Sequence, residues 1–130
     1  MTETSCLLDM TTPARAEKLR ALLPPGFVLT HGTARGDEHM KEIIAQADYA
    51  ISGQVAVSGH VLRAGKKLKL LHKWGVGYDN IDIATAKELG IKVARTTGSN
   101  ALPVAEFALG LMISALRYIG YGHAELKKGH

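Results

Sequence analysis

Two glycines follow a lysine in Lys73-Trp74-Gly75-Val76-Gly77, directly after the apolar run 68–72, and this stretch could bind an anion. Glycine has no Cβ, so a ligand can approach the main chain, and successive N–H groups in such a turn can form an anion-binding nest. Lys73 would add a full positive charge. A plain turn after a strand has the same pattern, so both interpretations stay open.

Two further loops could reach the same place. Asn100 ends the loop 95–100 and offers an amide donor where a long apolar helix starts, although Ser99 and Asn100 could simply cap that helix. Ser52 begins the loop 52–54, for which turn chemistry is the simpler explanation. The carboxyl ends of parallel strands face one crevice, so we expect these loops to lie beside the first.

Other chemistries find less support in the sequence. Asp79, Asn80 and Asp82 lack the spacing and the distal glutamate of a calcium loop, and the six histidines lack zinc-site spacing. We therefore expect no metal site. Neither Gly-x-Gly-x-x-Gly nor a phosphate-binding Gly-Lys-Ser/Thr loop occurs, so no self-sufficient nucleotide site is visible.

The composition predicts one globular domain. The chain has 130 residues, of which 46% are hydrophobic and 22% charged. Its net charge of +4 is dispersed and its aromatic residues are few, which argues against nucleic-acid binding. A single cysteine, Cys6, cannot form an internal disulfide and suits a reducing cytoplasm. Residues 1–5 do not resemble a signal peptide, and Glu106 with Pro103 argues against a membrane span over 101–119.

Strand-like and helix-like patterns alternate along the chain. Apolar or β-branched runs occur at 6–10, 27–30, 49–51, 68–72 and 91–94, and helical patterns at 13–23, 38–47, 58–64, 83–89 and 102–119. This order predicts an α/β fold, a flavodoxin-like three-layer architecture with a parallel five-stranded sheet and helices on both faces. Thr12 and Asp82 are expected to cap helices, and Gly90 to end one.

The last helix is apolar around its whole circumference. Such a helix needs cover on more than one side, which predicts a partner surface outside this domain. The following residues, 118–130, are polar and contain Gly120, Gly122 and Gly129, and we expect them to form no further element. The chain therefore reads as one domain over 1–130, truncated, with 102–130 a long connecting helix and tail.

Several motifs together resemble the D-isomer-specific 2-hydroxyacid dehydrogenase family, which includes phosphoglycerate dehydrogenase and the glyoxylate and hydroxypyruvate reductases. They are LKLLHKWGVGYDNID at 68–82, GIKV at 90–93, TGSN at 97–100 and VAE at 104–106, in order and correctly separated. The resemblance implies a substrate-binding domain interrupted by a Rossmann domain for NAD or NADP, which this chain does not contain. It also implies a homodimer formed through or near the helix 102–119.

The resemblance also implies roles for individual residues. The N–H groups of Val76 and Gly77 would hold the carboxylate of a small 2-oxo or 2-hydroxy acid, with Lys73 and Asn100 beside it, and Val76 would lie near the nicotinamide. Ser52 stands where phosphoglycerate dehydrogenases have an arginine, which favours a small oxo acid over a phosphorylated one. The family's catalytic residues have no counterpart here, so we expect none in this chain.

Two other functions remain open at this level. The chain could be a stand-alone module that binds small carboxylates, or an interaction domain that dimerises through the apolar helix without catalysis. Both use the same residues as the dehydrogenase interpretation, so binding and association measurements must separate them.

Overall fold

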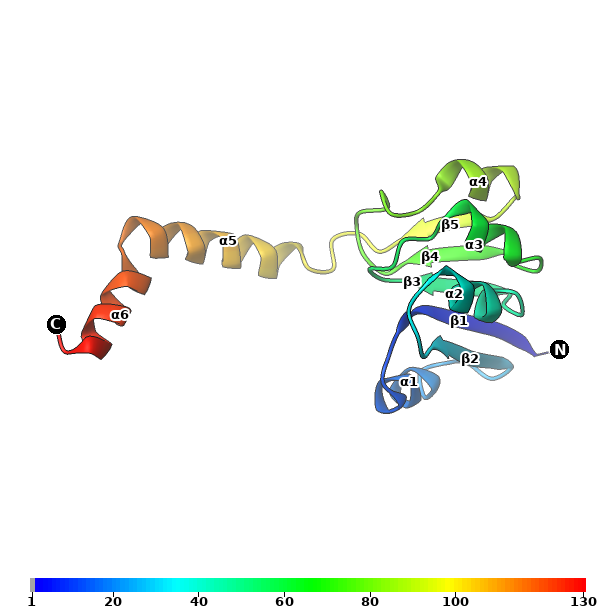
Figure 1. Cartoon of the computed structure of the whole chain (residues 1–130), viewed down its shortest axis with the longest axis horizontal. Coiled ribbons are helices and arrows are strands. Elements are labelled where there is room, and N and C mark those ends of the chain that lie inside the picture. Colours follow the sequence, from blue (N-terminus) through cyan, green and yellow to red (C-terminus); the bar gives the residue numbers. More distant parts are fainter. Residues whose placement is uncertain (1) are drawn as a thin grey trace. The chain divides into compact units, whose positions relative to one another are not determined.

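The structure, a computed structural model, describes residues 2–130 and divides into two compact units, one ending at Thr97 and the other comprising Gly98–His130. The first unit alternates strands and helices (Figure 1). In chain order these are β1 (Glu3–Met10), α1 (Pro13–Arg20), β2 (Phe27–Gly32), α2 (Asp37–Ile44), β3 (Tyr49–Ser52), α3 (Gly59–Ala64), β4 (Leu70–Lys73), α4 (Ile83–Glu88) and β5 (Lys92–Arg95).

The five strands form one parallel sheet in the order β2-β1-β3-β4-β5, which confirms the predicted α/β fold class. Strands that are consecutive in the sequence are neighbours in the sheet, except β2 and β3, which are separated by β1. The chain therefore leaves β1 in one direction and later continues from β3 in the other. Such a reversal point opens a crevice outside the carboxyl ends of its two strands.

The two faces of the sheet separate by residue parity. Cys6, Ala50 and Leu71 form one row across three strands, and all three belong to the main core. α2, α3 and α4 cover this face, next to one another in Figure 1. Leu7 and Ile51 point to the opposite face, where α1 packs beside β2. The predicted helices on both faces are thus present.

Local capping follows the predictions. Thr12 Oγ1 accepts a hydrogen bond from Arg15 N at 3.3 Å, just before the proline that starts α1. Asp82 Oδ1 accepts one from Thr85 N at 2.9 Å at the start of α4. Gly90 follows α4 with φ of +70°, a left-handed conformation that favours glycine.

The second unit holds two helices, α5 (Ala101–Leu116) and α6 (Ile119–Lys128). The expectation of one helix over 102–119 and no element after it is wrong. Tyr118 adopts a left-handed conformation with φ of 54°, and the helix axis bends by 59° at this break. α6 forms despite its glycines, with Lys128 paired to Glu125 at 2.8 Å and Gly129 as its left-handed cap.

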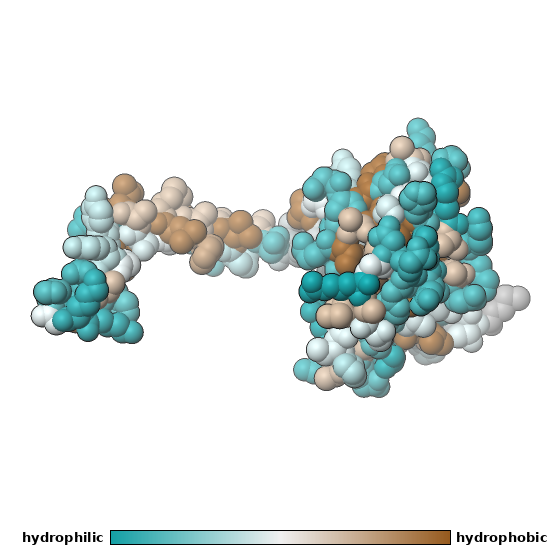
Figure 2. All heavy atoms as spheres, viewed as in Figure 1, coloured by the Kyte–Doolittle hydropathy of each residue, from teal (hydrophilic) through white to brown (hydrophobic). Residues whose placement is uncertain are grey.

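Within its own unit α5 buries none of its side chains. Figure 2 shows hydrophobic residues along its length, and the exposed fractions of Phe107 and Leu116 are 69% and 76%. Among residues 2–130 no single helix is long and apolar enough to cross a membrane, and only the bent pair α5 and α6 passes that test jointly.

Candidate functional site

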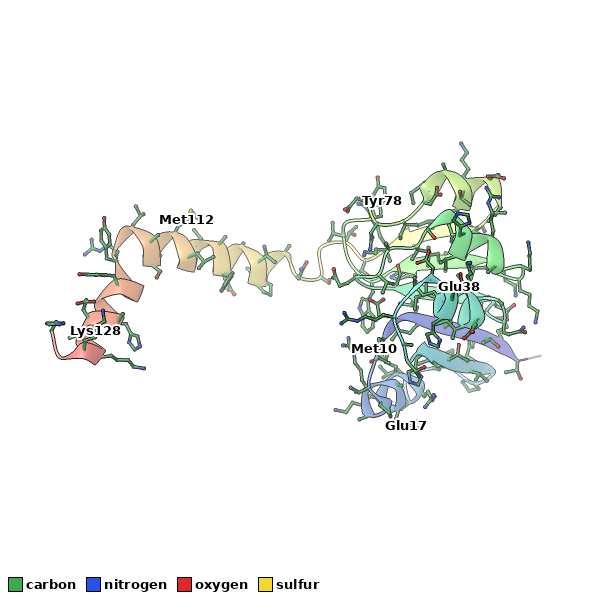
Figure 3. All side chains as sticks on the ribbon, viewed as in Figure 1. Met10, Glu17, Glu38, Tyr78, Met112 and Lys128 are labelled. Atoms are coloured by element: carbon green, nitrogen blue, oxygen red, sulfur yellow. The ribbon has the colours of Figure 1, made fainter. Side chains whose placement is uncertain are left out.

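The glycine-containing loop leaves β4 at the carboxyl edge of the sheet. Val76 is 47% exposed, and neither its N–H nor that of Gly77 has a hydrogen-bond acceptor within the described residues 2–130. Met10, at the end of β1, and Tyr78, just after the loop, lie at this same edge (Figure 3). Two adjacent free N–H groups at a loop surface can bind one anion between them.

Neighbouring strand ends fix the start of this loop. Trp74 N donates to Ser52 O at 2.7 Å, at the end of β3. Thr96 N donates to Lys73 O at 3.1 Å, and Arg95 Nη1 donates to Val76 O at 3.0 Å. The predicted proximity of the loops after β3, β4 and β5 is therefore confirmed as far as Thr96.

Lys73 is the last residue of β4 and not a loop residue, and its side chain is only 5% exposed. Its ammonium donates to Gly53 O and, at 3.0 Å, to Asn80 Oδ1. The positive charge thus lies beneath the loops, beside the crevice but without a free path into it. The predicted direct contact between Lys73 and a substrate stays a prediction.

Asp9 holds the loop after β3 from the other side. Its carboxylate accepts hydrogen bonds from Gly53 N, from Gln54 N at 2.7 Å and from Val55 N at 3.3 Å. Asn80 Nδ2 donates to Val55 O at 2.8 Å. The side chains of Asp9, near the end of β1, and of Asn80, in the loop after β4, therefore set the conformation of residues 53–55.

Ser52 and Asn100 were both predicted to contact the substrate. The Ser52 side chain is fully buried, and its Oγ has no hydrogen-bond partner in the described part of the chain, so a ligand in the crevice would not reach it in this conformation. Asn100 begins α5 in the second unit, and its side chain makes no capping hydrogen bond. Capping therefore does not occupy its amide, and its substrate contact stays a prediction.

Three residues at this edge were missed as site residues. Arg95 binds the Val76 carbonyl and lies 5.0 Å from the centroid of the Tyr78 ring, which places a guanidinium beside the free N–H groups. Asn80 and Asp9 hold the loops. Arg95 could have been recognised, because a cation directly after a strand reaches the carboxyl edge; the roles of Asp9 and Asn80 depend on tertiary contacts.

The arrangement of these groups suits an anion, and the one cysteine of the chain adds no reactive thiol to it. Burial raises the pKa of the Cys6 thiol to about 12, which makes it a poor nucleophile at neutral pH. Within residues 2–130, no group of three or more His, Cys, Asp or Glu side chains could hold a metal ion.

Known proteins resemble this chain in sequence and in fold. A sequence model of the D-isomer specific 2-hydroxyacid dehydrogenase catalytic domain matches residues 9–126. A hydroxypyruvate reductase of Thermotoga maritima is 44% identical over 94 residues, covering 72% of this chain and 30% of its own length. A D-3-phosphoglycerate dehydrogenase of Methanocaldococcus jannaschii is 34% identical over 121 residues, covering 92% of this chain.

Among solved structures, an NAD+-bound 3-phosphoglycerate dehydrogenase of Entamoeba histolytica superposes with a TM-score of 0.73 and 28% identity over 88% of this chain. The chain spans 30% and 23% of the length of the two curated relatives, and 39% of the Entamoeba chain.

Proposed function

The chain belongs to the D-isomer specific 2-hydroxyacid dehydrogenase family, and from this membership we propose that it is the substrate-binding part of an enzyme that transfers a hydride between NAD(P) and a small D-2-hydroxy or 2-oxo acid. The observation that carries the proposal is the pair of free N–H groups at Val76 and Gly77, on a loop fixed by Ser52 and Arg95. A carboxylate accepts two such donors and carries the charge that a cationic edge favours.

The remaining residues act around this carboxylate. Lys73 supports the loop from below through its hydrogen bonds to Gly53 and Asn80. Its positive charge is proposed to attract the substrate carboxylate. Asn100 and Ser52 are proposed as further substrate contacts, Ser52 after a movement of the loop 53–55 that follows it. Val76 is proposed to lie near the nicotinamide.

The cofactor is proposed to be NAD or NADP, held mainly by residues outside this chain. This chain contains no Gly-x-Gly-x-x-Gly fingerprint, so its own residues do not fit a dinucleotide site. The nicotinamide would supply the hydride, whereas this chain binds and orients the acid. No catalytic residue is assigned here, and we expect no reduction of glyoxylate or hydroxypyruvate by the isolated chain with NADH or NADPH.

Amide NMR titration of the ¹⁵N-labelled chain tests the carboxylate site. D-lactate should shift the amide resonances of Val76 and Gly77, and lactamide, which lacks the charge, should not. Val76→Pro removes one N–H donor and should weaken D-lactate binding, whereas Val76→Ala keeps the N–H and should bind normally. If D-lactate at saturating concentration leaves both amides unmoved, the carboxylate assignment is wrong.

We further propose a cytoplasmic homodimer that covers α5 through or near residues 102–119. The exposed apolar side chains of α5 support it, because an uncovered surface of this kind favours association. The same observation favours the second candidate function, an interaction domain without catalysis. Leu109→Asp and Leu116→Asp should lower the solution mass measured by light scattering. An unchanged mass would argue against the homodimer and against the interaction domain.

D-lactate binding separates the two candidate functions. A substrate domain should bind D-lactate at the Val76 and Gly77 amides, and a pure interaction domain should not.

A further inference from the structure

We propose that Arg15 binds a second anionic group of the substrate, in a cavity beside the Val76–Gly77 loop. The inference rests on the proposed function, because it takes the substrate carboxylate to lie at that loop. It assigns to this chain a preference for acids with a carboxylate or phosphate at the far end.

The cavity lies at the reversal point of the sheet, outside the carboxyl ends of β1 and β3. Its volume is about 450 Å³, within the range of small-molecule sites, and Met10, labelled in Figure 3, forms part of its wall. Arg15 reaches it from α1, Gln54 from the loop after β3 and Trp74 from the end of β4. Open α/β sheets bind their ligands in such positions.

Arg15 is the cation of this cavity. Its guanidinium carbon lies 5.5 Å from the centroid of the Trp74 ring, close enough for a cation–π contact that holds it over the cavity wall. Within the described residues, no carboxylate lies within 4.0 Å of it, whereas Arg20 and Arg63 are each paired with a glutamate at 2.9 Å. The guanidinium is therefore oriented and still able to bind an external anion bidentately.

Two other polar side chains of the cavity wall, those of Asp9 and Thr11, bear on anion binding. Asp9 is the one acidic residue in its wall, and three backbone N–H groups, those of Gly53, Gln54 and Val55, already donate to its carboxylate. Thr11 Oγ1 is enclosed in the same wall and has no hydrogen-bond partner within residues 2–130.

Trp74 joins this cavity to the carboxylate site, since it lines the cavity and lies two positions before Val76. One short substrate can therefore lie across both. Ser52, which stands in place of an arginine by resemblance to phosphoglycerate dehydrogenases, made a monoanionic acid the expected substrate. Arg15 restores a positive charge from the β1 side, so the missing arginine does not exclude a substrate with a second anionic group.

The test is NMR titration of the labelled chain with two matched pairs of 2-hydroxy acids. D-malate adds a second carboxylate to the D-lactate skeleton, and D-3-phosphoglycerate adds a phosphate to D-glycerate. In each pair we expect the acid with the second anionic group to bind about tenfold more tightly than its monoanion and to shift the Trp74 indole N–H resonance as well as the Val76 amide. The pair with the larger difference identifies the distal group.

Arg15→Ala should abolish the difference within each pair and leave monoanion binding unchanged, and Arg15→Lys should keep part of it. Lys18→Ala removes one charge from the same helix, outside the cavity, and should keep the full difference. Equal affinities within both pairs, or an Arg15→Ala variant that keeps the preference, would overturn the subsite while the Val76 and Gly77 shifts still support the carboxylate site. If none of the four acids shifts the Val76 and Gly77 amide resonances of the wild-type chain, the proposed function itself is wrong.

Discussion

The Lys73 ammonium donates to Asn80 Oδ1 at 3.0 Å, from the last residue of β4 to a loop seven positions further along the chain. The same ammonium binds Gly53 O, and Asn80 Nδ2 binds Val55 O at 2.8 Å. The two side chains thus connect the loop after β3 with the loop after β4. A buried charge with good acceptors stabilises such a connection, and losing one partner leaves it poorly solvated.

Asn80→Ala should lower the free energy of unfolding by about 2 to 4 kcal/mol. It removes an acceptor from the Lys73 ammonium and a donor from the carbonyls of Gln54 and Val55. Urea unfolding followed by circular dichroism measures the change. Asp79→Ala, a change at the exposed neighbouring residue, is the control and should cost less than about 0.5 kcal/mol. Equal effects of the two variants would show that Asn80 does not connect the loops.

Asp9→Ala should free the loop after β3. The carboxylate accepts from three successive N–H groups, two of them at Gln54 N and Val55 N over 2.7 and 3.3 Å, so without it these amides lose their acceptor. We expect their hydrogen exchange to accelerate at least about tenfold, measured by NMR under native conditions. Amides of Ala50 and Leu71 in the central strands should exchange at their former rates. Unchanged exchange at Gln54 would mean that Asp9 does not hold the loop.

The sheet was predictable because its signals are local. Short apolar runs, and caps such as Thr12 and Asp82, depend on a few neighbouring residues, and all five strands appeared in the expected order. The position of Val76 and Gly77 at the carboxyl edge followed from strand order alone.

The side-chain contacts of the site were not predictable in the same way. Lys73 reads as a loop cation, yet it is buried because Gly53 O and Asn80 Oδ1 lie within its reach, one of them twenty positions away. The left-handed turn at Tyr118 was missed because a tyrosine there carries no turn signal, unlike glycine or asparagine. Local patterns fix elements, whereas these features depend on contacts or conformations that the patterns do not encode.

Two glycine substitutions should have opposite effects. A Cβ at Gly59 would lie 2.7 Å from Asp82 Oδ2 and 2.8 Å from Thr85 Oγ1, so Gly59→Ala would disturb the cap of α4 and should destabilise the first unit by about 1 to 3 kcal/mol in urea unfolding. A Cβ at Gly110, inside α5, would meet no described atom within 4 Å beyond the adjoining backbone of its own helix. Gly110→Ala should therefore stabilise that helix by about 0.5 to 1 kcal/mol, seen as slower amide exchange across α5. A stable Gly59→Ala variant would contradict the close approach of α3 and α4.

Acidification should weaken the amino edge of the sheet, where Lys69 pairs with Glu3 at 2.7 Å and with Asp48 at 3.1 Å. The Lys69 bond holds the pKa of Glu3 below its ordinary 4.5, and a hydrogen bond from Thr4 N holds the pKa of Asp48 below 3.8. A carboxylate whose pKa falls on folding stabilises the protein above its unfolded pKa, and this stability is lost as the pH drops through the folded value. The urea concentration at the midpoint of unfolding should therefore decrease when the pH is lowered from about 5 to about 3.

Lys69→Met separates the two carboxylates in this acid response. Glu3 loses the main cause of its lowered pKa, whereas Asp48 keeps the hydrogen bond from Thr4, so the midpoint should start lower at neutral pH and fall less steeply. Lys66→Met, at an exposed lysine that forms no ion pair among residues 2–130, should keep the wild-type slope. Parallel pH profiles for the wild type and Lys69→Met would show that the Glu3 pKa does not depend on Lys69, because protonation would then cost both proteins the same stability.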